Sequence, residues 1–395
     1  MADRLSVLVL NQIAAAGLSR LPAEHYRVGK DLGDPAAILV RSADLHKAII
    51  ADSVRAIGRA GAGTNNIPVP AMTARGVPVF NAPGANANAV KELVLVGMLM
   101  AARNIAPALQ FVAQLDMAAP DLDRRVEDGK KAFAGHELTG QTLGIIGLGK
   151  IGCLVADAAI KLGMQVLGFD PHITVDAAWS LPSQVRKAAS VNDVLRNAQF
   201  ITLHVPLLDS TRHLVNDANI GLLRPGAVLL NFSRDGIAAE GAVKDALAGG
   251  RLSHYVSDFP SPVLAGLPGV VALPHLGAST QEAEENSAVM VVDQLRDYLE
   301  NGNIANAVNF PSVAMGRESP YRVAIANANV PNMLGQISTT MASAGLNIHN
   351  MVNKSRGDMA YTLVDVDSAP SAAVLAALRA IEGVSSVRFL PVLPG

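Results

Sequence analysis

The chain has 395 residues, of which half are hydrophobic and 17% are charged, with a formal net charge of −2. This length favours two to three domains with a large buried core, and the composition is that of a folded globular protein. Such a balanced charge gives no field that would gather nucleic acid or an anionic membrane surface, so we expect neither as a partner.

A single cysteine, Cys153, excludes an intramolecular disulfide and a cysteine-built zinc site, and we expect no metal. The first residues do not have the design of a signal peptide. The longest apolar segment, residues 93–102, is far shorter than the roughly 20 residues that span a bilayer. The sequence therefore predicts a cytoplasmic protein.

Short apolar runs alternate with helical stretches over the first hundred residues; the runs are 5–10, 37–40, 54–57 and 77–80. Alternation of this kind predicts a parallel sheet with helices on both faces, which binds ligands at the carboxyl ends of its strands. Arg41 and Ser42 follow the second run, and Gly61 lies in the loop after the third. A guanidinium beside a hydroxyl suits a phosphate or a carboxylate, although an exposed loop arginine would give the same pattern.

A helix predicted over about 90–103 is apolar nearly all round. Such a helix is buried, either between domains or between subunits, and it suggests at least a dimer.

A glycine-rich motif stands at the centre of the chain, where Gly147, Gly149 and Gly152 form a G-x-G-x-x-G frame. A predicted strand, 143–146, precedes it and a predicted helix, 151–162, follows. The first glycine makes a tight turn, the second lets the backbone approach a pyrophosphate, and the third lets the helix pack on the strand. The helix N-terminus would then hold the pyrophosphate.

The next predicted strand, 165–170, ends on Asp170, which lies 18 residues after Gly152. An acid about 20 residues beyond the glycines binds the ribose 2′-hydroxyl in dinucleotide sites. It favours NAD over NADP, because a carboxylate repels a 2′-phosphate. Glycines alone would also fit an ordinary tight turn, but the full arrangement of strand, helix, strand and acid favours a cofactor site.

Further strands are predicted at 199–204, 227–231, 253–257 and 270–273, which completes a six-stranded doubly wound domain. Arg234, Asp258 and His275 follow the last three of them. A lone histidine is more often structural, but one beside an arginine and an aspartate at neighbouring strand ends is a candidate general base. Arg234 would bind a substrate carboxylate and polarise the adjacent oxygen.

These motifs together resemble the D-2-hydroxyacid dehydrogenases, and specifically the members of the serine pathway that oxidise 3-phosphoglycerate. The matching segments are 40–42, 58–63, 142–152, 231–236 and 274–280. The resemblance implies a flavodoxin-like substrate-binding domain, formed by 1–89 plus 290–310, and a Rossmann NAD-binding domain at 90–289. It implies that Asp258 orients the nicotinamide amide or ribose. We also expect cofactor contacts from Arg234, His275, Lys150, Ile151, Val205, Phe232, Ser233 and Gly277.

One family feature is missing. In the family a glutamate just before a proline pairs with the histidine, but here the segment is Asp258-Phe-Pro-Ser-Pro262, which is shorter and has no second acid. Either another carboxylate reaches His275, or His275 works unpaired, or the activity is weak.

The last part of the chain predicts strands near 322–326, 346–352, 360–366 and 384–390, with helices near 333–344 and 371–381. This is a ferredoxin-like βαββαβ pattern, and after a linker at 303–319 it resembles the regulatory ACT domain, here 320–395. Asn329 and Asn347 align with two asparagines that bind serine in inhibited members, whereas Asn327 stands in place of a histidine. Either L-serine is an effector or the domain is architectural and dimerising.

Three functions remain open. The first is NAD-dependent oxidation of 3-phosphoglycerate by a homodimer or homotetramer. The second is a glyoxylate/hydroxypyruvate reductase or another D-2-hydroxyacid dehydrogenase, against which Arg41-Ser42 and the C-terminal domain argue. The third is a non-catalytic NAD-binding scaffold.

Overall fold

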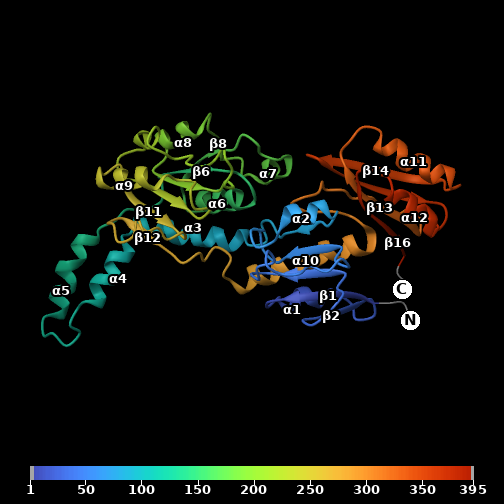
Figure 1. Ribbon diagram of the computed structural model, residues 1–395. Helices are drawn as coiled ribbons and strands as arrows, with labels where there is room; N and C mark the ends of the chain where they lie inside the picture. Colours follow the sequence, from blue (N-terminus) through green and yellow to red (C-terminus); the bar gives the residue numbers. More distant parts are fainter. Residues whose placement is uncertain (1–3, 393–395) are drawn as a thin grey trace. The chain divides into compact units, whose positions relative to one another are not determined.

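The computed structural model describes residues 4–392 (Figure 1); residues 1–3 and 393–395, at the ends of the predicted first and last domains, lie outside the described residues. The chain forms two compact units, one from residues up to Asn86 together with those from Gln281 onward, the other Ala87–Thr280. The boundaries predicted at 90 and 289 fall inside helices α3 (Ala87–Ala102) and α10 (Gln281–Asn301). The units divide instead at the first residue of each helix, because a helix packs as one rigid element.

The first unit contains a parallel five-stranded sheet in the order β2-β1-β3-β4-β5, which is the flavodoxin-like order. Its strands are β1 (Leu5–Leu10), β2 (Tyr26–Gly29), β3 (Ala37–Val40), β4 (Ala56–Arg59) and β5 (Val79–Phe80). The sequence prediction missed β2. This edge strand buries only its first residue fully and therefore lacks the apolar run of its neighbours.

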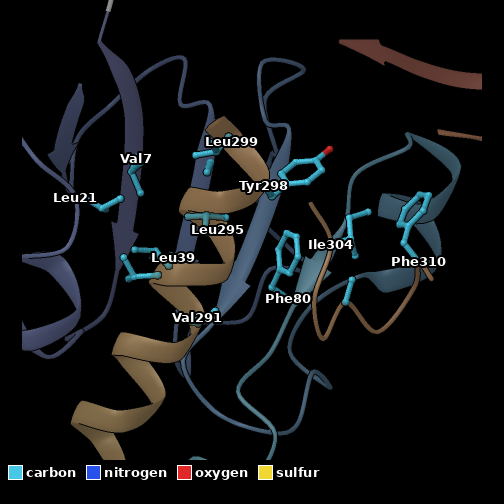
Figure 2. Packing of buried hydrophobic residues seen from close by; sticks show 14 of the residues in the cluster. Val7, Leu21, Leu39, Phe80, Val291, Leu295, Tyr298, Leu299, Ile304 and Phe310 are labelled. Atoms are coloured by element: carbon cyan, nitrogen blue, oxygen red, sulfur yellow. The ribbon is translucent and has the colours of Figure 1, made fainter. Parts of the chain in front are cut away.

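Helix α10 covers one face of this sheet. Its buried side chains Val291 and Leu295 belong to one core cluster with Val7 and Leu39 of the strands, and the ring of Tyr298 packs against that of Phe80, as Figure 2 shows. The short helices α1 (Ala15–Leu18) and α2 (Val69–Ala74) complete the two layers around it. The chain therefore returns to its first sheet after passing through the second unit.

The second unit contains a parallel seven-stranded sheet in the order β12-β11-β10-β9-β6-β7-β8. The order reverses between β6 and β9, and such a reversal is where doubly wound folds bind their ligands. The strands are β6 (Thr142–Ile146), β7 (Gln165–Phe169), β8 (Arg186–Lys187), β9 (Phe200–Leu203), β10 (Ala227–Asn231), β11 (Leu252–Ser257) and β12 (Val270–Ala272). Six strands were predicted, and β8 was missed because it consists of two exposed basic residues.

Helices α6 (Lys150–Lys161), α7 (Val175–Ser180), α8 (Val191–Asn197), α9 (Glu240–Ala248) and α3 surround this sheet. Helix α3 buries Val94 and Met98 in the core but leaves Val96 and Leu99 about half exposed. Beyond it, α4 (Ile105–Ala113) has no buried residue, and α5 (Leu122–Gly129) follows. No single helix within residues 4–392 is long and apolar enough to cross a membrane, although α3 and α4, bent by 69° at their break, pass that test together by length and composition.

The C-terminal segment forms a four-stranded antiparallel sheet in the order β14-β15-β13-β16. Its elements are β13 (Tyr321–Ala328), α11 (Met333–Ser343), β14 (Ile348–Arg356), β15 (Met359–Val366), α12 (Ala372–Arg379) and β16 (Val384–Pro391). One face carries α11 and α12, while Tyr361 and Leu363 of the other face enter the core that contains α10. Two doubly wound parallel sheets and a ferredoxin-like βαββαβ segment confirm the predicted fold class.

Candidate functional site

Gly147 and Gly149 lie between β6 and α6, Gly152 lies in the first turn of α6, and the surroundings of the three glycines differ. Gly147 has a φ of 97°, and a Cβ there would lie 2.5 Å from the carbonyl oxygen of His204. A Cβ on Gly152 would lie 2.1 Å from the carbonyl oxygen of Gly147. Around Gly149, by contrast, a Cβ would meet nothing within 4 Å. The absent side chain of Gly149 therefore leaves open space before Lys150 and Ile151 at the N-terminus of α6, where a pyrophosphate would bind.

Asp170 directly follows β7 and holds the glycine loop. One carboxylate oxygen accepts the backbone N–H of Leu148 at 2.9 Å, and the other accepts that of His172 at 2.9 Å. An ionised carboxylate has about four acceptor positions, so two remain for a ribose hydroxyl. The sequence suggested only the ribose contact; the bond to the loop is a second role.

The turn after β10 is built around the buried side chain of Asn231. Its Nδ2 donates to the carbonyl of Arg234 at 3.0 Å, and its Oδ1 accepts the N–H of Ser233 at 3.2 Å. The Ser233 hydroxyl donates to the carbonyl of Val205, in the loop after β9. These bonds bury Phe232 and leave the guanidinium of Arg234 exposed at the strand end. Asn231 was absent from the predicted site, although its position as the last residue of a strand marked it.

Asp258 follows β11 and is only 1% exposed. Its Oδ2 accepts the N–H of Gly277 at 3.2 Å, and its carbonyl accepts the N–H of His275 at 2.9 Å. Burial raises the pKa of the Asp258 carboxyl, against the opposing effects of His275, the Gly277 amide and Arg234. Its Oδ1 is buried and has no hydrogen-bond partner among residues 4–392. A buried acceptor without a partner is costly, so it suits an N–H donor of a bound ligand such as the nicotinamide amide.

His275 is exposed and adopts the left-handed backbone conformation, with a φ of 48°. Its ring packs against the ring of Phe259, with centroids 4.9 Å apart and planes at 63°. The ion pairs found inside Ala87–Thr280 do not include His275. The segment that lacks the family glutamate therefore places the ring of Phe259 beside the imidazole of His275. A positive φ on a non-glycine residue costs energy and is often found at functional positions.

In the first unit, the loop after β3 is fixed by its neighbours. Asn11 Oδ1 accepts the N–H groups of Ser42 and Ala43 at 3.1 and 2.6 Å. Arg59 Nε donates to the carbonyl of Arg41 at 3.1 Å. A Cβ on Gly61, whose φ is 151°, would lie 2.3 Å from Nη1 of Arg59. Gly61 therefore makes room for Arg59, while Arg59 and Asn11 present the side chains of Arg41 and Ser42 outward; neither of these supporting residues was predicted.

The C-terminal segment contains a cavity of about 210 Å³ between β13 and α11. Four asparagines are among its lining residues: Asn327, Asn329, Asn332 and Asn353. Asn327 is 1% exposed, and its Oδ1 has no partner in the described chain. Asn347 does not line this cavity, because it precedes β14 at the opposite end of the sheet, about 20 Å away along the strands. A single chain therefore does not bring Asn329 and Asn347 together.

Comparisons with known proteins agree on one family. The sequence pattern of the D-isomer specific 2-hydroxyacid dehydrogenase NAD-binding domain matches residues 95–277. A D-3-phosphoglycerate dehydrogenase of Methanocaldococcus jannaschii is 36% identical over 75% of this chain, which spans 55% of that relative's length. The one from Haemophilus influenzae is 33% identical over 85% of this chain and 81% of its own.

Solved structures show the same fold. The NAD⁺-bound 3-phosphoglycerate dehydrogenase of Entamoeba histolytica superposes with a TM-score of 0.60 at 24% identity, covering 78% of this chain and 99% of that one. At this identity the likeness supports the fold alone.

Proposed function

Since the chain belongs to the D-isomer specific 2-hydroxyacid dehydrogenase family, we propose that it oxidises the C2 hydroxyl of 3-phospho-D-glycerate with NAD, giving 3-phosphohydroxypyruvate, the first step of L-serine biosynthesis. The observation that carries the proposal is the grouping of Arg234, Asp258 and His275 after β10, β11 and β12, in the sheet that also bears the glycine loop. Together they offer a base, a carboxylate-binding cation and a buried acceptor for the cofactor.

The residues present fit NAD. Gly147, Gly149 and Gly152 would hold the pyrophosphate, and Asp170 would bind the ribose. The unpartnered Oδ1 of Asp258 would accept the carboxamide N–H, and the turn from Phe232 to Arg234 would lie beside it. When bound, NAD supplies the acceptor for the hydride that leaves C2 of the substrate.

His275 acts as the general base in this proposal and removes the proton from the C2 hydroxyl. Arg234 binds the neighbouring carboxylate and stabilises the negative charge that develops on the C2 oxygen. Phe259 fixes the plane of the imidazole by its edge contact. A positive charge on His275 favours the ionised form of the Asp258 carboxyl, against the effect of its burial, which raises the pKa of that group.

The phosphate is assigned to Arg41 and Ser42, whose loop is held firmly by Asn11 and Arg59. A built anion-binding loop favours 3-phosphoglycerate over glyoxylate or hydroxypyruvate, because the latter two have no phosphate. A second dehydrogenase activity on an unphosphorylated hydroxyacid remains the competing proposal, and a non-catalytic NAD-binding scaffold is the third.

The test is NADH formation from 3-phosphoglycerate and NAD with enzymatic removal of the product, run beside reduction of glyoxylate and hydroxypyruvate. We expect His275→Ala to lower kcat by a factor of about 10²–10⁴, the usual contribution of a general base. The matched control His349→Ala changes an exposed histidine on β14 and should leave turnover unchanged. Wild-type turnover in His275→Ala would refute the assignment, and reduction of glyoxylate without oxidation of 3-phosphoglycerate would favour the second function.

For the C-terminal segment we propose an ACT-type regulatory role, with L-serine as the ligand of the asparagine-lined cavity. A small amino acid suits its size, and the unpartnered Oδ1 of Asn327 would accept an ammonium proton. Asn329 lines this cavity, whereas Asn347 would contribute only from a second copy. Calorimetric titration with L-serine and D-serine decides between this role and a purely architectural domain.

We also propose a homodimer or homotetramer in the cytoplasm. The exposed apolar residues of α3 and α4, among them Leu99, Leu109 and Val112, support self-association. Sedimentation analysis tests the oligomeric state; a monomer at micromolar concentration would contradict it.

A further inference from the structure

The side chain of Arg41 already has a negatively charged partner. Its Nη2 lies 2.6 Å from Oε1 of Glu284, in the first turn of α10 and the same compact unit. The two side chains are 38% and 43% exposed, so water and ligands reach both. The contact uses one nitrogen of the guanidinium. Arg41 is also the proposed binding residue for the substrate phosphate.

Glu284 is held in place by the helix that carries it. Helix α10 has 21 residues, and Ser287, Ala288 and Val291, directly after Glu284, are buried. The backbone under Glu284 is therefore fixed. Its place in the first turn is one where the helix dipole favours a negative charge. The loop of Arg41 is also fixed, by Asn11 and Arg59. The ion pair is thus formed from two rigid supports before any substrate arrives.

An incoming phosphate has to compete with this carboxylate. A phosphate monoester carries nearly two negative charges at neutral pH, and it would bind the same guanidinium beside a fixed like charge. A hydroxyacid without a phosphate has no such group for Arg41 to bind, so the Glu284 carboxylate does not compete with it.

We propose that Glu284 is a specificity-determining residue that occupies Arg41 and weakens the binding of phosphorylated substrates relative to unphosphorylated ones. This inference rests on the proposed function in so far as Arg41 binds the phosphate. Glu284 pairs with Arg41 of its own unit, whereas Arg234 and His275 belong to the other unit, so we expect its influence in substrate binding and not in the chemical step.

The test is Glu284→Gln, which keeps the size of the side chain and removes its charge. We expect the KM for 3-phosphoglycerate to fall about two- to fivefold, the range that corresponds to an exposed ion pair of up to about 1 kcal/mol. The value of kcat and the KM for D-glycerate should not change. Inorganic phosphate should inhibit the variant, or bind to it in a calorimetric titration, with a dissociation constant lowered by a similar factor.

Glu285→Gln is the matched control, because Glu285 lies in the same helical turn but accepts a hydrogen bond from Gln281 at 2.9 Å. It removes the same charge and should leave the KM for 3-phosphoglycerate as in the wild type. An unchanged or higher KM in Glu284→Gln, or an equal fall in both variants, overturns the inference. If no variant oxidises 3-phosphoglycerate, the proposed function fails, and the phosphate titration still decides the role of Glu284.

Discussion

At the scale of single residues, the glycine loop shows that one motif combines two physical requirements. Gly152 is needed by the protein itself, since its Cβ would overlap the carbonyl oxygen of Gly147. A Cβ on Gly149 would meet no protein atom within 4 Å, so packing of the protein does not require a glycine there. We therefore propose that Gly152 serves the fold and that Gly149 serves the binding of the cofactor.

This separation gives a paired prediction. We expect Gly149→Ala to keep the wild-type melting temperature within about 2 °C and to raise the KM for NAD at least tenfold, because the methyl group enters the space of the pyrophosphate. Gly152→Ala should lower stability by about 1–3 kcal/mol, as expected for a clash with backbone. Thermal melts and NAD titrations of both variants measure this. Equal stability loss in the two would contradict the assignment of Gly149 to the ligand.

At the scale of elements, the C-terminal end of α10 is satisfied by arginines from further along the chain. The last carbonyl groups of a helix have no partner within it. Arg388 donates to the carbonyls of Tyr298 and Leu299, Arg317 to that of Glu300, and Arg322 to that of Asn301. Three positive charges thus lie where the helix dipole is negative. They tie the C-terminal segment to the helix that covers the first sheet.

We expect Arg388→Ala to destabilise the unit that contains α10 by about 1–3 kcal/mol. The substitution removes two charge-assisted hydrogen bonds, of 3.3 and 3.0 Å, and the stacking of the guanidinium 4.5 Å above the ring of Tyr298. Arg388→Lys keeps the charge but loses the planar fork, and should recover only part of the loss. Urea unfolding followed by circular dichroism measures both variants. A wild-type midpoint for Arg388→Ala would mean that these contacts contribute nothing.

The elements that the sequence could predict are those whose apolar pattern is local. The runs 143–146 and 227–231 are buried throughout, and the run 5–10 alternates buried with partly exposed residues, so all three were recognisable as strands. Strands β2 and β8 belong to the sheets only through their neighbours and were missed for that reason.

The same limit applies to the candidate site. Asp258 directly follows a strand, and Arg234 and His275 lie three residues after theirs, so strand order alone was enough to group them. Glu284 and Phe259 gain their importance from a side-chain contact, which spacing along the chain does not reveal. Asn347 shows the converse: alignment with a family motif placed it beside Asn329, while the register of the sheet separates the two within one chain.

At the scale of the whole molecule, the first unit depends on a buried ion pair. Arg322 and Asp365 are both fully buried and joined by two bonds, of 2.6 and 2.8 Å. The remaining donors of Arg322 bond to the carbonyls of Asn301, Met315 and Gly316. Every part of the guanidinium is therefore used, and the pair joins β13 and β15 to the linker and the end of α10. Breaking a buried pair by removing one charge typically costs about 3–5 kcal/mol.

We expect the two compact units to unfold separately. Calorimetry should show two unfolding transitions, because each unit has its own core. Asp365→Asn should lower the free energy of unfolding of the first unit alone, by about 3–5 kcal/mol, because it leaves Arg322 buried without a counter-charge. NAD at a concentration of about 100 times its dissociation constant should raise the free energy of unfolding of Ala87–Thr280 alone, by about 2.7 kcal/mol.

A pH series identifies the first transition independently. Burial alone would raise the pKa of the Asp365 carboxyl, but its bonds from Arg322 and the Glu318 N–H outweigh that effect and lower the pKa. A lowered pKa means that the pair stabilises the unit above the ordinary aspartate pKa of about 4 and loses this contribution as the pH falls further. Below about pH 4, the stability of the first unit in the wild type should therefore approach that in Asp365→Asn, while the transition of the second unit should not show this effect. A single transition that responds to NAD and to Asp365→Asn alike would show that the two units unfold as one.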